Sequence, residues 1–70
     1  MQRQIVSSSN LKSVGFDPIS QILEVEFLDR SVYQYSGVLS SVYSGLMSAS
    51  SKGSYLSQKV KGVYSYRQVR

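Results

Sequence analysis

The sequence predicts an α+β domain in which a small antiparallel β-sheet is covered by one or two short helices. Residues in the first half alternate between apolar and polar with the period of two typical of strands, and after Gly37 the spacing becomes helical. Seventy residues make one domain, close to the lower limit for a self-sufficient core. We expect a β-meander of three to four strands and the element order β-β-β-α-α-β.

Three segments of the first half have the pattern of strands. The expected strands are Leu11–Phe16, Gln21–Leu28 and Val32–Ser36, with a proline-containing turn at 17–20 between the first two. The second strand is the clearest, because three apolar side chains alternate with Glu24 and Glu26. We therefore expect one buried face and one hydrated face that carries both glutamates.

The register of the second hairpin decides where two tyrosines, Tyr33 and Tyr35, point. A two-residue loop at 29–30 would put both on the face of the glutamates, whereas a three-residue loop at 28–30 would pair Val25 with Tyr33 and turn both towards the core. Both loops need a positive φ near Arg30, which suits glycine better than arginine. The glutamine between the tyrosines favours the inward orientation, with hydroxyls still able to reach an edge.

The second half is predicted to hold two helices and a closing strand. A helix over 39–50 follows from the helical spacing of its apolar residues, and Ser50–Ser54 is expected to break it. A second short helix is expected to begin near Tyr55 and to close at Gly62, before a last strand over 63–69. Residues 1–7 are expected to form an N-terminal tail or an irregular edge, and residues 8–70 a single domain.

Composition excludes several functional classes. The chain has no cysteine and no histidine, which removes disulfides, thiolate metal sites and the usual general base. We therefore expect no catalytic residues, no metal and no cofactor, and not an enzyme. No apolar run is long enough to span a bilayer and residues 1–7 lack a signal-peptide pattern, so we expect a cytoplasmic protein without a membrane partner.

Charge is divided unevenly along the chain. The net charge is +4, but residues 1–30 carry −1 whereas residues 31–70 carry five cations and no acid. A half-chain of this kind attracts phosphate-bearing partners, although basic residues also simply solubilise small domains.

Aromatic residues are the candidates for base stacking. A Tyr-x-Tyr pattern occurs twice, as Tyr33 with Tyr35 and as Tyr64 with Tyr66. Rings on a sheet stack on unpaired bases with little sequence preference. The alternative for each ring is ordinary core packing.

Residues 51–55 are the candidate anion site. Ser51, Lys52, Gly53 and Tyr55 combine a glycine turn, hydroxyls and a lysine at the start of an expected helix, where a phosphate can be bound. The alternative is a helix connection capped by serine. The further cations proposed for phosphate contact are Lys59, Lys61 and Arg67.

Taken in order, these signals resemble the KTSC domain family, named from its occurrence at the C-terminus of some lysyl-tRNA synthetases. The matching stretches are Ser8–Leu11, Val14–Pro18, Leu23–Phe27, Val32–Tyr35, Gly37–Val38, Val42–Tyr43 with Leu46, Ala49–Tyr55 and Tyr64. Two departures are Arg30, where the family usually has a small turn residue, and Leu39, where it usually has proline. The resemblance implies this fold and an RNA-binding role.

Three functions remain open from the sequence. The first is a non-catalytic domain that binds RNA or single-stranded nucleic acid through the basic second half and the Tyr-x-Tyr motifs. The second is a homo-oligomer that sequesters a nucleotide ligand, including a cyclic one, and the third is a protein-interaction module.

Overall fold

The computed structural model describes all 70 residues. Its five strands form one antiparallel sheet in the order β1-β2-β3-β4-β5, and two helices lie between β4 and β5 in the chain. The elements are β1 (Gln4–Ile5), β2 (Leu11–Asp17), β3 (Ile22–Phe27), β4 (Val32–Tyr35), α1 (Ser40–Ser48), α2 (Lys52–Lys59) and β5 (Tyr66–Gln68). The predicted α+β class and the meander are confirmed.

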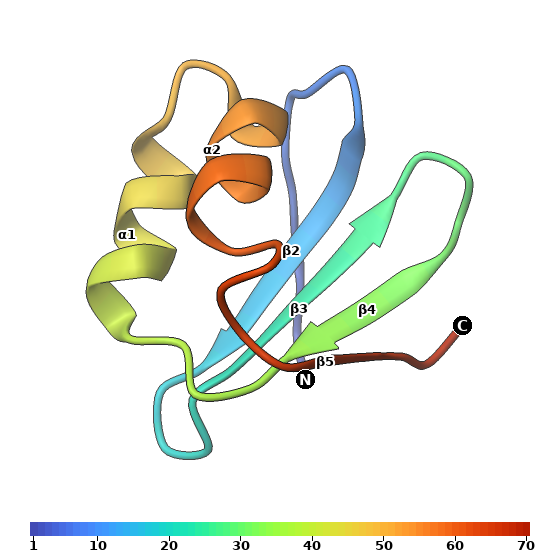
Figure 1. The fold of residues 1–70 in the computed structure, drawn as a ribbon. Coiled ribbons are helices and arrows are strands. Elements are labelled where there is room, and N and C mark those ends of the chain that lie inside the picture. The colour runs from blue at the N-terminus through green and yellow to red at the C-terminus, as the bar shows by residue number, and fades with distance from the viewer.

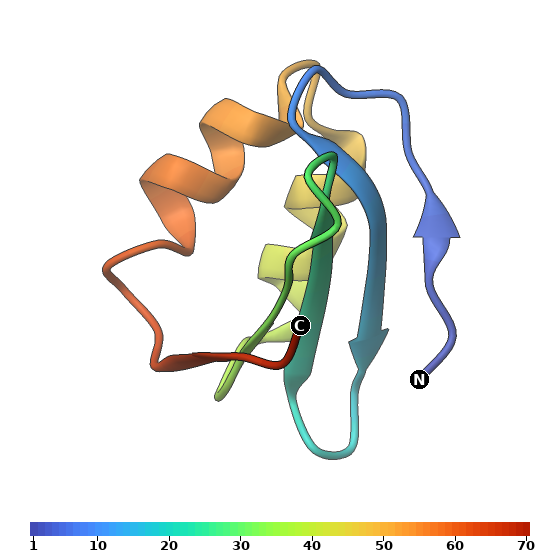
Figure 2. The same ribbon diagram turned by 90° about the vertical axis from the view of Figure 1, so that its right-hand side faces the viewer.

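Both helices pack on the same face of the sheet. Figures 1 and 2 show α1 and α2 on one side of β2, β3 and β4, and β1 at the far edge. None of the helices has both the length and the apolar character that crossing a bilayer requires.

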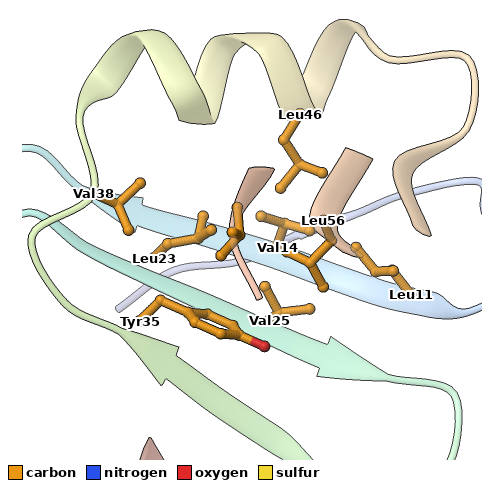
Figure 3. Packing of buried hydrophobic residues seen from close by; sticks show 9 residues of the cluster. Leu11, Val14, Leu23, Val25, Tyr35, Val38, Leu46 and Leu56 are labelled. Atoms are coloured by element: carbon orange, nitrogen blue, oxygen red, sulfur yellow. The ribbon is translucent and has the colours of Figure 1, made fainter. Parts of the chain in front are cut away.

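The hydrophobic core lies between the helices and the sheet. Leu46 of α1 and Leu56 of α2 point at the sheet in Figure 3, and both are almost fully buried. They pack against residues that alternate along the strands. The buried cluster consists of Leu11, Val14, Leu23, Val25, Tyr35, Val38, Leu46, Leu56 and Val60. Because alternation directs these side chains to the face that the helices cover, a single layer of helices is enough to bury them.

The β3–β4 hairpin adopts the three-residue loop. Val25 pairs with Tyr33, and the loop is closed by hydrogen bonds from Phe27 N to Ser31 O (2.9 Å) and from Arg30 N to Phe27 O (2.9 Å). Arg30 has a φ of 74°, as the loop geometry requires. Both tyrosines therefore face the helices, which confirms the orientation that Gln34 favoured.

Several element boundaries differ from the prediction. The N-terminal segment expected as a tail or an irregular edge contributes β1, which pairs with β2. The second helix begins earlier than expected, at Lys52, inside the segment Ser50–Ser54 that was predicted only to break the first helix. The Ser51 hydroxyl caps it by accepting a hydrogen bond from Ser54 N (3.4 Å). The last strand is shorter than expected, at Tyr66–Gln68, since the chain first turns through Gly62 with a φ of 77°.

The face opposite the helices is not hydrated as expected. Glu24 and Glu26 are only 8% and 7% exposed. Arg3 Nη1 lies 2.5 Å from Glu24 Oε2, and Arg70 Nη2 lies 2.6 Å from Glu26 Oε2. The reason is that residues near the two chain ends reach across the sheet and cover the glutamates, an arrangement that strand alternation alone does not reveal.

Candidate ligand-binding groove

A groove of about 700 Å³ opens between the β3–β4 hairpin and α2. Its volume is within the range of small-molecule sites, and it mixes aromatic, aliphatic and polar side chains as such sites do. The lining residues are Ser9, Asn10, Leu11, Phe27, Leu28, Asp29, Ser31, Tyr33, Tyr35, Gly53, Leu56, Ser57, Lys61, Gly62 and Tyr66.

Four aromatic rings form one wall of this groove. The Tyr33 ring lies 5.6 Å from Phe27, 6.5 Å from Tyr35 and 5.7 Å from Tyr66, measured between centroids. Tyr35 and Tyr66 are 5.9 Å apart. The cluster follows from register, because Val25 pairs with Tyr33, and Tyr35 pairs with Tyr66 on the next strand. We call Phe27, Tyr33, Tyr35 and Tyr66 the aromatic wall.

The wall is graded from buried to exposed. Tyr35 is only 2% exposed and belongs to the core, Tyr33 is half-buried, and Tyr66 is 62% exposed. Burial, with smaller contributions from the neighbouring Tyr33 and Tyr66, raises the pKa of the Tyr35 phenol, so it stays neutral at physiological pH. Tyr66 and the accessible part of Tyr33 are therefore the rings available to a ligand.

One cation stands over the aromatic wall. Lys61 Nζ lies 5.1 Å from the centroid of the Phe27 ring, which is a cation–π distance. Lys61 is exposed and follows α2 in the turn that leads to Gly62. It places an ammonium group beside rings that can stack, which is the pairing that a base with its phosphate requires.

The opposite wall comes from α2 and from the loop before β2. Gly53, Leu56 and Ser57 contribute from the helix, and Ser9 and Asn10 from the loop. Asp29, the groove's single acid, accepts hydrogen bonds from the Ser31 hydroxyl (2.6 Å) and backbone N–H (3.0 Å), which lower the pKa of its carboxyl. The remaining polar groups of these walls are hydroxyls and one amide.

The groove brings together five of the eleven residues proposed from the sequence. These are Tyr33, Tyr35, Gly53, Lys61 and Tyr66. The other six, which lie elsewhere, are Ser51, Lys52, Tyr55, Lys59, Tyr64 and Arg67.

The expected anion site at 51–55 is divided between other roles. Ser51 caps α2, and Lys52 Nζ donates to Ala49 O (3.2 Å) at the end of α1. Tyr55 packs against Gly45, where a Cβ would collide with its hydroxyl. Only Gly53 of this segment faces the groove, because a helix turns successive side chains to different sides.

The cations of the second half do not form one surface, and one of them, Arg70, is paired with an acid of the first half. Arg67 lies on the face away from the helices, where its Nη2 is 3.4 Å from Gln34 Oε1. Arg70 pairs with Glu26. The physical reason is strand alternation in β5, because Tyr66 and Arg67 point to opposite faces. The fold also brings Glu26 of the first half beside Arg70.

Sequence reasoning missed most of the polar and apolar lining. Phe27 is one of the three apolar residues that alternate with the glutamates in the second predicted strand, and the observed register makes it part of the aromatic wall. Asn10, Ser31 and Ser57 come from loops and a helix that only the tertiary fold brings together. The sequence did hold one signal: in the register of the three-residue loop, Phe27 and Tyr33 lie on the same face of the sheet.

Comparison with known proteins places this fold. The family model described as the KTSC domain matches residues 7–66. The chain belongs to the KTSC domain family. The resemblance drawn from the sequence is therefore confirmed over nearly the whole chain.

Solved and curated KTSC relatives agree with this assignment. The crystal structure of a KTSC domain protein from Yersinia pestis superposes with a TM-score of 0.95 at 40% identity, covering 99% of this chain and 97% of that one. An uncharacterized protein of Stutzerimonas stutzeri is 43% identical over 61 residues, which cover 87% of this chain and 86% of the relative. A lysine–tRNA ligase of a Nostoc strain is 36% identical over 61 residues, which are only 11% of that longer protein.

Proposed function

We propose that this KTSC domain is a non-catalytic module that binds single-stranded RNA, with an unpaired base in the groove between the β3–β4 hairpin and α2. The carrying observation is the aromatic wall with Lys61 over Phe27. The exposed Tyr66 ring offers stacking to a base, and Lys61 in the same groove offers charge to its phosphate. Neither role needs a catalytic group.

The relatives raise the weight of RNA over other phosphorylated partners. A KTSC-type segment is part of the Nostoc protein named lysine–tRNA ligase, whose name states that it acts on a tRNA. A second binding contact in a linked domain can raise the affinity of the whole protein without adding chemistry. We carry this role to the present chain as part of the proposal.

The geometry predicts a modest salt dependence. Lys61 is the groove's single cation, whereas Lys59 is exposed at the end of α2 and outside the groove. Contact of Lys61 with one phosphate of a single strand gives a slope of log K against log salt of about −0.7. The arginines across the sheet are held by Glu26 and Gln34, so we do not expect them to add to the slope.

The test is a titration of a fluorescein-labelled RNA hexanucleotide, followed by anisotropy. Tyr66→Ala removes an exposed ring and should weaken binding about 5- to 160-fold, since stacking contributes about 1–3 kcal/mol per base. Lys61→Ala should weaken binding and flatten the salt slope, whereas Lys59→Ala serves as the matched lysine outside the groove and should change affinity less. Equal effects of the two lysine variants, together with no effect of Tyr66→Ala, would refute the proposal.

A free nucleotide is the second candidate ligand, because the groove volume of about 700 Å³ suits a small molecule. The same titration separates the two candidates. The small ligand would be favoured if a mononucleotide displaced the hexanucleotide and also raised the melting temperature of the protein when it filled the same fraction of sites. RNA binding that millimolar mononucleotide does not compete would favour the strand.

A further inference from the structure

We infer that Asn10, held against Gly53 of α2, is the specificity-determining residue of the groove and hydrogen-bonds the edge of the bound base. The inference rests on the proposed function and adds a division of labour to it. Stacking on the aromatic wall accepts any flat ring, whereas the amide of Asn10 distinguishes a nucleobase from an apolar ring.

The backbone of Asn10 is held by two hydrogen bonds, although the residue is exposed and lies in a loop. Its backbone N–H donates to the Ser8 hydroxyl (3.2 Å), and its carbonyl accepts from Leu28 N (3.0 Å) in the β3–β4 loop. Figures 1 and 2 show this β1–β2 connection beside the start of α2. Asn10 therefore links the β1–β2 connection to the β3–β4 loop. Both segments border the groove, and Asn10 also lies beside Gly53 of α2.

The side chain of Asn10, by contrast, has no hydrogen-bond partner in the protein. Its backbone groups are the only atoms of the residue that make hydrogen bonds. The amide keeps two donors and one acceptor available in a groove whose acid, Asp29, accepts both hydrogen bonds of Ser31 on Oδ1 and has no donor. It is thus the groove's side chain that can donate and accept side by side, as the edge of a base demands.

Gly53 makes this placement possible. A Cβ built at position 53 would lie 2.7 Å from Asn10 Nδ2 and 3.5 Å from Asn10 Cγ. Any larger residue there would displace the amide from its present position. Glycine in the first turn of α2 costs the helix stability relative to alanine, so the space for Asn10 is obtained against local propensity.

The experiment compares two hexanucleotides that stack alike but differ at the base edge. One carries adenine at every position, and the other carries indole in place of every base, which keeps the ring and the phosphates. Asn10→Ala should weaken binding of the adenine hexanucleotide about three- to tenfold and leave the indole hexanucleotide unchanged. The backbone hydrogen bonds of residue 10 do not need its side chain, so we expect this variant to fold.

Gly53→Ala provides an independent route to the same result. It should reproduce the loss for adenine while raising the melting temperature or leaving it unchanged, and the double variant should bind no more weakly than Asn10→Ala alone. Lys59→Ala again serves as the control outside the groove.

Failure of the inference and failure of the proposed function are distinguishable. If the wild type binds neither hexanucleotide, the proposed function is refuted and the inference with it. If the wild type binds both hexanucleotides and Asn10→Ala weakens them equally or not at all, the inference is overturned while RNA binding stands.

Discussion

Replacing Arg30 by glycine should stabilise the protein. Arg30 occupies the last position of the β3–β4 loop with a φ of 74°, a left-handed conformation that costs an L-residue about 1–2 kcal/mol. Its guanidinium makes no hydrogen bond or ion pair. Arg70 Nε donates a hydrogen bond (3.0 Å) to the backbone carbonyl of Arg30, and this bond does not need the Arg30 side chain. Glycine relieves the strain without removing a contact.

The expected gain is the strain relieved minus the extra freedom that glycine has in the unfolded chain. That freedom costs about 0.5–1 kcal/mol, which leaves a net stabilisation centred on about 0.75 kcal/mol. For a domain of this size such a change raises the melting temperature by about 3–6 °C. Urea unfolding followed by circular dichroism measures the free energy directly.

Arg30→Ala is the matched control. It removes the same charge and the same long side chain but keeps the Cβ that causes the strain, so its stability should stay within about 0.5 kcal/mol of the wild type. Glycine no more stable than alanine at this position would refute the reasoning that Arg30 is strained.

Stability should fall as pH drops below about 4.5, because all four carboxyl pKa values are lowered in the folded protein and unfolding then takes up protons. For Glu24, burial raises the pKa but is outweighed by hydrogen bonds from Gln34 and Arg3 and by the charge of Arg3, whereas Glu26 is lowered first by the hydrogen bond from Ser13. The stabilisation from these carboxylates is complete above pH 4.5, the ordinary pKa of glutamate, and is lost as the pH falls through their lowered pKa values in the folded protein. Urea midpoints that do not change between pH 6 and pH 3 would contradict this. Glu26→Gln should lower stability at pH 7 and make the same pH profile shallower, while a profile parallel to the wild type would exclude a role for Glu26. Leu46→Ala, at a fully buried position, should cost about 2–5 kcal/mol in urea unfolding, against less than about 0.5 kcal/mol for the exposed Leu39→Ala, and equal costs would contradict the observed core.

The hairpin shows how far pattern reasoning reaches. Alternation in β3 identified the strand and its two faces, and the loop chemistry allowed two registers. A shift of one residue would have moved Tyr33 from the groove to the opposite face. The choice depends on burying two aromatic rings under helices that are contributed later in the chain, and local sequence does not contain that energy.

The cations show the corresponding limit for the candidate site. Lys61 and Arg67 are six residues apart and were expected to act together, but strand alternation and the end of α2 put them on different faces. Asn10 and Gly53 are distant in the chain and meet only because the β1–β2 loop lies against α2. Long-range contacts of this kind leave no periodic signal.

The sequence by itself determined the α+β class, the meander, both helices and the aromatic residues, because each depends on side-chain period or on local capping and turn chemistry. The tertiary structure alone decided that the glutamates are buried under arginines from both chain ends, and that a groove joins the aromatic wall to Lys61 and Asn10. The physical reason is that burial and charge pairing depend on which distant segments pack together, whereas period and capping depend on neighbours in the chain.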